Sequence, residues 1–303
     1  MIIARLKGGL GNQLFIYAAA RGIASKHNIP LIFDTISGSK RDFYRRGKPL
    51  LHHFNTKIEA ASVYQCYEGV YGRIRRIISR NICKYLQFKY RFYVTESGNI
   101  KRFDERLLNN KPIWDVYLDG YWQSEKYFKH IEDEIRQELT IVTLHDKENI
   151  ALAERIRTEN AVCIHARRLH GVANVANPHP NPSIKPLGLS YYLSAINFIG
   201  ERIKNPVFFC FSDYPAWLQE NMKLDYPVVF VTHNSVVGET KNYEDLWLMT
   251  QCKHYIIADS TFSWWGAWLS TNTYKIVCAP SITFGLFNRD WIPKDWHTIE
   301  VSN

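Results

Sequence analysis

The chain has 303 residues, enough for one large or two medium domains, and 46% of them are hydrophobic, which suffices to build a core in each. The formal net charge of +9 indicates anionic partners, such as nucleic acid, phosphorylated small molecules or an acidic membrane surface. We find neither an uninterrupted apolar run of about twenty residues nor the pattern of a secretory signal, so we expect a soluble protein of the cytosol.

The first predicted elements are a strand at 2–6, a tight glycine loop at 7–11, a helix at 12–27 and a strand at 30–34. This order is typical of a βαβ unit in a parallel sheet. The glycines of the loop "GGLGNQ" let the backbone approach a ligand, and the helix N-terminus that follows favours a phosphate. Because the loop is neither a GxGxxG motif nor a P-loop, a plain tight turn remains the alternative.

Residues 70–95 contain seven Lys or Arg and no Asp or Glu. Isoleucines from Ile74 to Ile82 recur in this segment at helical spacing. One interpretation is a cationic amphipathic helix lying on an anionic membrane. The other is a solvated basic face above an ordinary stripe that faces the core.

The second half of the chain repeats the alternation of strands and helices. The predicted strands are 161–166, 207–212, 227–231, 255–258 and 275–279, and the predicted helices are 189–203, 214–222, 242–252 and 262–270. Two such arrays predict an α/β protein of two Rossmann-like domains facing a central cleft, with ligands at the carboxyl ends of the strands. We place the domains at 1–150 and 151–303.

Six cysteines are scattered without C-x-x-C spacing. Cys163, Cys210 and Cys278 lie in apolar runs, so we expect small core residues rather than disulfides or zinc ligands. Neither D-x-D, nor H-E-x-x-H, nor a clustered Cys/His set occurs in the sequence, which argues against a bound metal and leaves anion binding to arginine and helix dipoles.

The stretch "CIHARRLH" ends a predicted strand with a concentration of positive charge. Arg167 and Arg168 match the bidentate recognition of a diphosphate. Neighbouring residues of a strand point to opposite faces, so we expect only one of the two to reach the ligand. His165 shares the side of Arg167, and this favours a functional pair over an ordinary salt bridge.

The stretch 242–268 provides a second candidate anion site. Ser260, Thr261 and Ser263 follow the strand end "AD" at a predicted helix N-terminus, where they either bind an anion or serve as ordinary caps. We expect the three tryptophans of that helix to be core residues. In the preceding helix, Glu244 and Asp245 either complement the helix dipole or supply a carboxylate to a guanine edge.

Five motifs in this order resemble those of the bacterial α1,2-fucosyltransferases, glycosyltransferase family eleven. They are "GGLGNQLFIYAAA", "LDGYWQSEKYF", "IHARR", "FSDYPAWL" and "CKHYIIADSTFSWWGAWL". The resemblance implies a GT-B-like fold, GDP-β-L-fucose as donor, a galactoside acceptor, inversion at the anomeric carbon and no metal or other cofactor.

The resemblance also implies roles for individual residues. It puts Arg167 on the diphosphate, His165 beside the nucleotide and Asp245 on guanine. The residues of the donor-facing turn correspond to Gly9, Gly11, Asn12 and Gln13. Arg167, Asn12 and the helix start at 260–263 are our candidates for stabilising the charge that grows on the β-phosphate.

The chain departs from the family pattern H-x-R-R-x-D, because His170 stands where the aspartate is usual. His170 is therefore a hypothesis for the catalytic base, and an exposed loop histidine is the simpler interpretation. A glycosyltransferase for another nucleotide sugar remains open, as does a basic nucleic-acid-binding protein, although we recognise no module of the latter kind. If the 70–95 segment binds a membrane, we expect a lipid-linked glycan acceptor, as in O-antigen assembly, at the cytoplasmic face.

Overall fold

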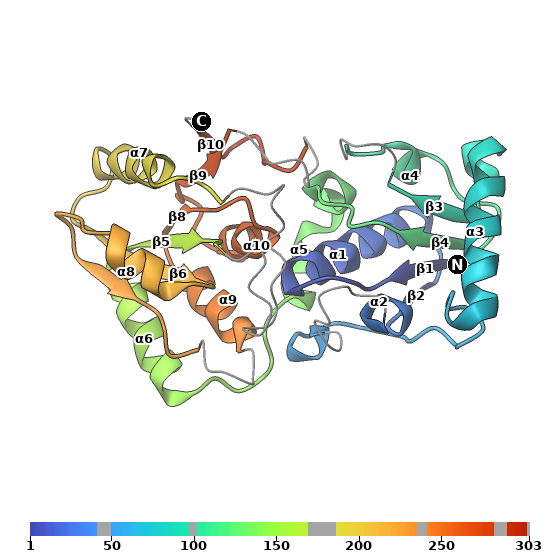
Figure 1. Ribbon diagram of the computed structural model, residues 1–303, viewed down its shortest axis with the longest axis horizontal. Helices are drawn as coiled ribbons and strands as arrows, with labels where there is room; N and C mark the ends of the chain where they lie inside the picture. The colour runs from blue at the N-terminus through green and yellow to red at the C-terminus, as the bar shows by residue number, and fades with distance from the viewer. Residues whose placement is uncertain (41–49, 97–101, 169–185, 235–240, 282–289, 302–303) are drawn as a thin grey trace. The chain divides into compact units, whose positions relative to one another are not determined.

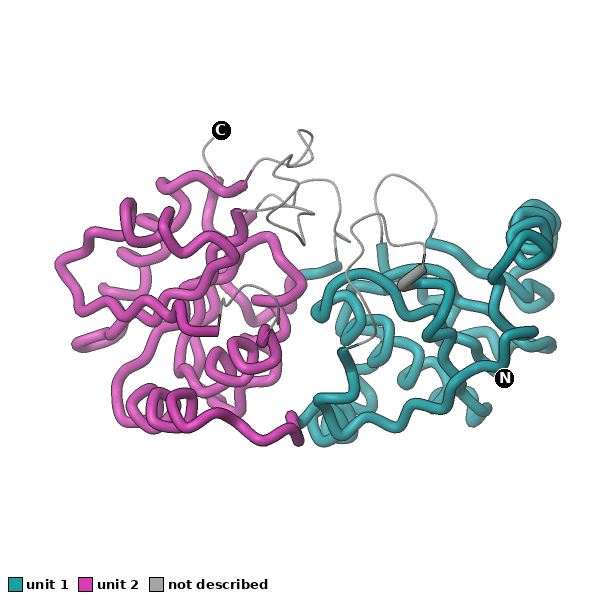
Figure 2. Tube along the Cα trace, turned by 60° about the horizontal axis from the view of Figure 1, so that its bottom comes forward, with its two compact units in different colours: residues 1–140, 285–291 teal, residues 141–284, 292–303 magenta. Residues whose placement is uncertain are grey.

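The computed structural model describes residues 1–40, 50–96, 102–168, 186–234, 241–281 and 290–301. The chain divides into two compact units (Figures 1 and 2). Unit 1 comprises residues 1–140 and 285–291, and unit 2 comprises residues 141–284 and 292–303. Each unit contains a parallel sheet with helices, so the α/β prediction is confirmed.

Unit 1 is built on a four-stranded sheet in the order β2-β1-β4-β3. Its strands are β1 (Ile2–Arg5), β2 (Leu31–Asp34), β3 (Tyr93–Thr95) and β4 (Val116–Asp119). Its helices are α1 (Leu10–His27), α2 (Ser37–Lys40), α3 (Gly69–Tyr85), α4 (Arg106–Asn109) and α5 (Glu132–Glu138), with short 3-10 turns at η1 (Leu51–His53), η2 (Phe88–Tyr90), η3 (Glu125–Tyr127) and η4 (Lys129–Ile131). The chain runs from β1 outward to β2 and returns to the other side of β1, so the topological switch lies between β1 and β4.

Helix α1 is the central helix of unit 1. It packs against β1 and β2, and small or apolar side chains occupy most of its circumference, which suits a helix buried on nearly all sides. Gly22 lies so close to η3 that an added Cβ would meet the Tyr127 carbonyl oxygen at 2.1 Å. The glycine therefore allows the second half of α1 to pack closely against η3.

Unit 2 is built on a six-stranded parallel sheet in the order β10-β9-β8-β5-β6-β7. Its strands are β5 (Asn160–Ala166), β6 (Pro206–Ser212), β7 (Val228–Phe230), β8 (His254–Ile256), β9 (Val277–Pro280) and β10 (His297–Ile299). Its helices are α6 (Lys147–Thr158), α7 (Leu189–Gly200), α8 (Pro215–Asn221), α9 (Asn242–Gln251) and α10 (Thr261–Leu269). The chain crosses back between β5 and β8, which is the switch point of a Rossmann-type sheet.

The buried residues of the two units confirm two predictions. Trp264, Trp265 and Trp268 are buried and contact one another. All six cysteines of the chain are free and buried, as expected for small core residues. No helix in the described part of the chain has the length and apolar character to span a bilayer.

The basic segment differs from the prediction in its second part. The helix ends at Tyr85, and after η2 the chain forms β3, which pairs with β4 in the sheet of unit 1. Tyr93, Val94 and Thr95 are residue types that favour a strand, and their pairing to β4 outweighs any continuation of the helix.

Candidate functional site

In unit 2 the predicted residues gather at the switch point of the sheet. His165, Arg167 and Arg168 lie at the carboxyl end of β5, and Ser260 and Thr261 follow β8, which pairs directly with β5. At such a point the connections that leave two neighbouring strands run in opposite directions, and the crevice outside the carboxyl ends of these strands is where Rossmann-type sheets bind ligands. This edge of unit 2 is the candidate nucleotide site.

Arg167 lies at this edge with its charge accessible. Its Nη1 atom is 3.1 Å from Oδ2 of Asp213, and its side chain is 36% exposed. Asp213 follows β6, and its Oδ1 atom also accepts a hydrogen bond of 2.7 Å from the Arg168 backbone N–H. The carboxylate therefore orients the guanidinium of Arg167 and fixes the backbone behind it.

Arg168 is held within the protein. Its Nη1 donates to the Leu187 carbonyl oxygen at 2.8 Å, and its guanidinium carbon lies 3.8 Å from the centre of the Trp217 ring. A cation over an indole ring is a stabilising arrangement. The two arginines thus differ in their partners, and donor binding by Arg168 stays a prediction.

His165 is almost completely buried at the end of β5. Its ring packs against Phe262 with 5.6 Å between ring centres, and its Nδ1 atom has no hydrogen-bond partner among the described residues. Burial lowers the pKa of His165 to about 4; the Asp213 charge opposes this shift and the Arg167 charge adds to it. The imidazole is therefore neutral at pH 7, with one nitrogen that donates and one that accepts.

The start of α10 offers backbone N–H groups to an anion, and the Ser263 hydroxyl is engaged by backbone carbonyl oxygens at the helix start. Ser260 is the N-cap but makes no side-chain cap bond, and the first turn contains no acidic residue. The Ser263 hydroxyl is fully buried and donates to the carbonyl oxygens of Ser260 at 3.1 Å and Ala258 at 3.4 Å. The N–H groups and positive dipole end of α10 are thus the groups suited to an anion.

The two carboxylates in the first turn of α9 have different environments. Glu244 is fully buried and accepts bonds from His145 Nδ1 at 2.7 Å and from the Asp146 backbone N–H at 3.2 Å. Asp245 accepts a bond of 2.8 Å from Asn234 Nδ2, and burial raises its pKa to about 7, which the Asn234 bond opposes and the Glu244 charge reinforces. Both oxygens of Glu244 are engaged by His145 and Asp146, so Asp245 is the carboxylate of the pair that is suited to guanine.

In unit 1 the glycine loop lies at the switch between β1 and β4. Gly8, with a φ of 78°, has the left-handed backbone that the turn requires, and a Cβ there would lie 2.9 Å from Asn12 Nδ2. Asn12 Oδ1 accepts a bond of 2.9 Å from Gln123 Nε2, which belongs to the loop after β4. Loop and helix start are therefore tied to the neighbouring strand.

The side chain of Gln13 is hydrogen-bonded within the protein. Its Nε2 donates to the Gly8 carbonyl oxygen at 2.9 Å, its Oε1 accepts from the Leu50 backbone N–H at 2.8 Å, and the residue is only 5% exposed. Gly9 is the N-cap of α1 and Gly11 lies in its first turn. Donor contacts by these residues stay predictions, and the side chain of Gln13 has a positioning role in this arrangement.

Sequence reasoning missed a charged cluster at the same edge of unit 1. Asp119 accepts bonds from Arg5 at 3.1 Å, Lys7 at 2.5 Å and the Tyr93 hydroxyl at 2.7 Å. Burial alone would raise the pKa of Asp119, but the Lys7 and Arg5 charges outweigh it and hold the pKa well below its usual range. The signal in the sequence was an acidic residue ahead of the turn in "LDGYWQ", which is the last residue of β4, and its partners were not apparent.

The loop after β4 has an unusual backbone. Trp122 has a φ of 54°, in the left-handed region that is uncommon for a residue other than glycine. The Glu96 carboxylate accepts bonds from the backbone N–H groups of Tyr121 at 2.7 Å and Trp122 at 2.9 Å, which holds this conformation. Strained backbone that is held in this way is typical of functional loops.

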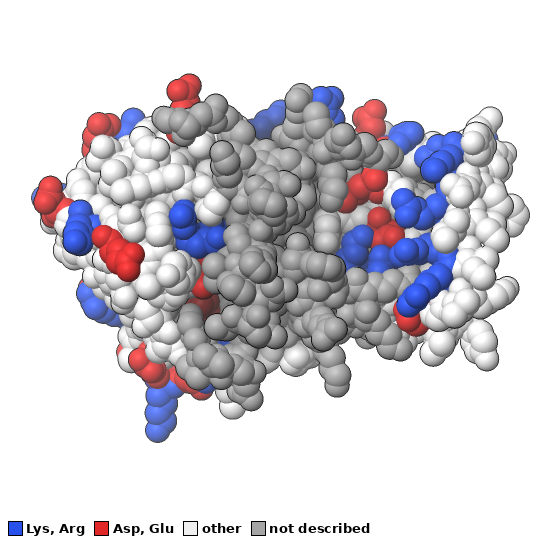
Figure 3. Space-filling model, viewed as in Figure 1, with Lys and Arg blue, Asp and Glu red and all other residues white. Residues whose placement is uncertain are grey.

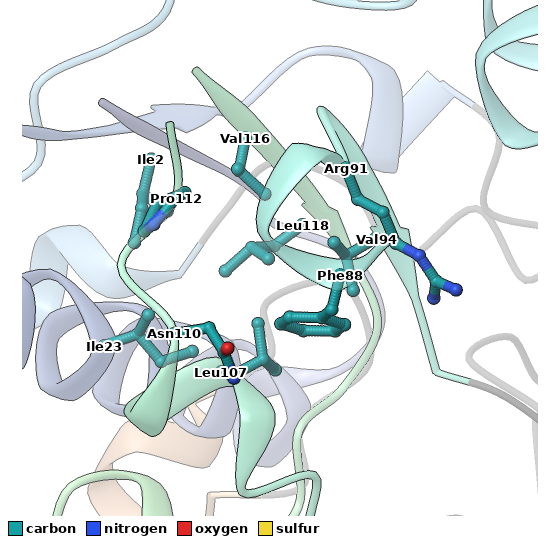
Figure 4. Close-up of a pocket in the computed structure, with 10 residues that line it drawn as sticks. All are labelled: Ile2, Ile23, Phe88, Arg91, Val94, Leu107, Asn110, Pro112, Val116 and Leu118. Carbon is teal, nitrogen blue, oxygen red and sulfur yellow. The ribbon is translucent and has the colours of Figure 1, made fainter. Parts of the chain in front are cut away.

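Other features add little to the site. His170 lies outside the described residues. The enclosed cavity in Figure 4, between η2, α4 and the sheet of unit 1, measures about 20 Å³, room for a water molecule and far too small for a nucleotide. The described residues include no group of three or more His, Cys, Asp or Glu side chains that could hold a metal ion, and metal independence stays a prediction.

Comparison with known proteins identifies relatives of the whole chain. Residues 72–299 match the family described as Glycosyl transferase family 11. An Escherichia coli alpha-1,2-colitosyltransferase is 31% identical over 99% of this chain and 99% of that protein, and the E. coli O-antigen biosynthesis glycosyltransferase WbnK is 31% identical over 96% and 97%. A galactoside alpha-(1,2)-fucosyltransferase 2 of Pongo pygmaeus is 28% identical over 51% of this chain and 45% of that protein.

Among solved structures, a mutant of Arabidopsis thaliana FUT1 in complex with GDP aligns with a TM-score of 0.51, covering 92% of this chain and 70% of that chain at 11% identity. This likeness is one of fold, and the predicted GT-B-like fold is confirmed. The family matches three quarters of the sequence, and the similarity to the colitosyltransferase extends over nearly all of it. The chain is therefore a member of glycosyl transferase family 11.

Proposed function

We propose that the protein transfers L-fucose, or a closely related 6-deoxy sugar, from its GDP derivative to the 2-hydroxyl of a galactose, with inversion and without a metal. The observation that carries this proposal is the arrangement at the β5/β8 switch point. There Arg167, partly exposed and oriented by Asp213, lies at the end of β5, the strand paired to β8, and β8 leads into α10. A guanidinium and a helix N-terminus are the donors that a diphosphate requires.

Asp245 supports guanine as the base. An ionised carboxylate accepts two N–H bonds, and a guanine edge offers two neighbouring N–H groups whereas adenine and the pyrimidines do not. Asn234 already orients one oxygen of Asp245. We assign the base to Asp245 and the diphosphate to Arg167 and the start of α10.

The donor sugar has two candidates. The α1,2-fucosyltransferase relatives favour L-fucose, whereas the full-length similarity to an alpha-1,2-colitosyltransferase favours colitose, which is L-fucose without its 3-hydroxyl. A site that hydrogen-bonds this hydroxyl rejects the deoxy sugar strongly, whereas an apolar site discriminates weakly. Both donors share the GDP moiety and therefore the same unit 2 contacts.

The reaction develops negative charge on the β-phosphate as the sugar leaves and positive character on the anomeric carbon. Arg167 and the N–H groups of α10 are in position before the reaction begins, so they stabilise the leaving diphosphate without reorganisation of the site. With a pKa near 4, His165 is a poor base at neutral pH and acts as a neutral hydrogen-bonding group beside the nucleotide. His170 stays the hypothesis for the group that takes the acceptor proton.

The proposed acceptor is a galactose-containing bacterial surface glycan under assembly, carried on a lipid at the cytoplasmic face of the plasma membrane. The similarity to an O-antigen biosynthesis glycosyltransferase supports this class of acceptor.

The first experiment is a thermal-shift panel of GDP, UDP, dTDP and GDP-fucose with and without chelator, followed by transfer assays with GDP-fucose and GDP-colitose on galactosides. We expect stabilisation by the GDP compounds alone, unchanged by chelator and lost in Arg167→Ala. Preference for UDP or dTDP would overturn the donor assignment. Loss of binding on chelation would overturn metal independence.

A further inference from the structure

The outer side of α3 carries an uncovered row of apolar side chains. Ile74, Ile77, Ile78 and Ile82 are 46–58% exposed, and Tyr71 and Tyr85 are 78% and 90% exposed. With 3.6 residues per turn, these positions share one side of the helix. The interpretation of this stripe as core-facing is therefore wrong for the described structure.

The side of α3 that faces the protein is polar or small instead. Gly72, Ser79 and Cys83 are its buried residues, and Ser79 shares a hydrogen bond of 3.3 Å with the Tyr67 hydroxyl. The Arg75 guanidinium lies 4.4 Å from the centre of the Tyr67 ring and donates to the Tyr64 carbonyl oxygen at 2.8 Å. These contacts hold α3 in an orientation that directs its isoleucines outward.

Basic side chains border this row. Arg73, Arg80 and Lys84 are exposed and fall along one edge of the apolar stripe, and Asp and Glu are absent from residues 70–95. Figure 3 shows uncharged side chains over α3 at the right-hand edge of the view, bordered by Lys and Arg. An apolar stripe with a basic border is the pattern of a helix that lies in the plane of a membrane interface.

We propose that α3 is a docking surface for an anionic lipid bilayer. Its isoleucines enter the boundary between head groups and acyl chains, while Arg73, Arg80 and Lys84 contact lipid phosphates. Tyr71 and Tyr85, near the two ends of the helix, have the amphipathic rings that favour a membrane–water interface. The proposal depends on neither the donor nor the acceptor.

A second copy of the chain is the competing occupant, and charge disfavours it. A two-fold contact through α3 would place the same surface of both copies together. In an antiparallel contact the basic borders of the two copies would face each other, and in either arrangement residues 70–95 supply no carboxylate to offset their positive charge. An anionic bilayer supplies the missing charge.

The test is flotation of the full-length protein with vesicles of phosphatidylcholine alone or with about 30% phosphatidylglycerol. We expect binding only to the anionic vesicles, and its loss when salt is raised from about 0.1 to 0.5 M. Ile74→Glu/Ile78→Glu should weaken binding at least tenfold. Arg73→Glu/Arg80→Glu should do the same, because each basic residue near the surface contributes about 1 kcal/mol.

Matched controls are available in unit 2. Ile150→Glu/Leu193→Glu changes two partly exposed apolar residues, and Lys223→Glu/Lys294→Glu makes the same change of charge at two exposed lysines. We expect both controls to bind vesicles like the wild type, with unchanged circular dichroism in every variant. Equal binding by the α3 and control variants would overturn the proposal.

Two further outcomes are informative. Wild-type protein that remains with the unbound fraction on anionic vesicles overturns the proposal. So does a dimer in light scattering that Ile74→Glu/Ile78→Glu converts to a monomer without vesicle binding, which would assign the surface to a second copy. Vesicle binding without any response to GDP would contradict the proposed function but would support α3 as a membrane-docking surface.

Discussion

At the ends of β1 and β4 in unit 1, Arg5 and Lys7 share the buried carboxylate of Asp119. At the ends of β5 and β8 in unit 2, by contrast, Arg167 lies beside Asp213 with about a third of its side chain exposed. Both edges are switch points of parallel sheets. At each edge a strand leads into a glycine loop or a helix start suited to an anion. The difference lies in how accessible the cations are, because the side chains of Arg5 and Lys7 are 8% and 20% exposed and that of Arg167 is 36% exposed.

In unit 1 the cations hold the end of β1 in place. Arg5 also donates to the Ser37 hydroxyl and carbonyl oxygen, each at 3.0 Å, so the end of β1 is held from several directions. In unit 2 a single carboxylate divides its two oxygens between the Arg167 side chain and the Arg168 backbone. The comparison teaches that unit 2 leaves a guanidinium accessible to a ligand, whereas unit 1 buries its cations in contacts within the protein.

The largest effect is expected from breaking the charged cluster of Arg5, Lys7 and Asp119 in unit 1. Asp119→Ala leaves Arg5 and Lys7 buried without their shared counterion and should lower the free energy of unfolding by about 3–5 kcal/mol. Asp115→Ala is the control, because that carboxylate is 61% exposed and its pair with the N-terminus should contribute less than about 1 kcal/mol. Urea unfolding followed by fluorescence measures both. Similar losses for the two variants would mean that the cluster has no special weight.

Arg167→Ala should act on catalysis and barely on stability. Loss of one preorganised donor to the leaving group should lower kcat/KM about 100- to 1,000-fold. Arg167→Lys, which keeps the charge but not the forked geometry, should lie in between. Arg155→Ala is the control, since that side chain is half exposed and pairs with Glu159 at the C-terminal end of α6. An Arg167→Ala enzyme with wild-type kcat/KM would place the diphosphate elsewhere.

Gly8→Ala tests the stiffness of the unit 1 loop. The left-handed backbone of Gly8 and the approach of Asn12 should make this change cost about 1–2 kcal/mol of stability. Gly188→Ala should be nearly neutral, because an added Cβ there meets only Ser190 Oγ at 3.6 Å and the backbone is extended. Thermal unfolding of the two variants side by side checks the difference, and equal midpoints would count against a strained loop.

The fold was largely predictable from sequence because buried parallel strands read as continuous apolar runs between turn residues. The predicted strands 161–166 and 207–212 appear as β5 and β6 within one residue at each end. The orientation of α3 was not predictable, since its apolar stripe faces outward and its core side is built from Gly, Ser, Cys and an arginine over a tyrosine ring. Periodicity identifies a stripe but not the side on which the protein lies.

The candidate site was predictable where its residues adjoin in sequence, as His165 and Arg167 do at the end of one strand. Its second half was not, because Asp213 and Asn234 follow different strands and meet their partners only through sheet order. The same holds for Asp119, whose partners Arg5 and Lys7 are more than a hundred residues away in sequence.

The smallest predicted effect is the pH dependence of GDP binding through Asp245. Guanine needs the ionised carboxylate, but burial raises the pKa of Asp245 to about 7 in the free protein, so below that pH a proton must leave before GDP binds. Affinity should therefore increase up to about tenfold per unit as pH rises towards 7, and then level off. The β-phosphate of GDP, with a pKa of about 6, contributes in the same direction.

The variant Asp245→Asn separates the two contributions. It should bind GDP more weakly and retain only the pH dependence that comes from the phosphate. Calorimetry of both proteins between about pH 5.5 and 8 therefore isolates the contribution of the carboxylate. Identical slopes would mean that another group reads the base, and that the positive edge of unit 2 recognises the diphosphate without help from α9.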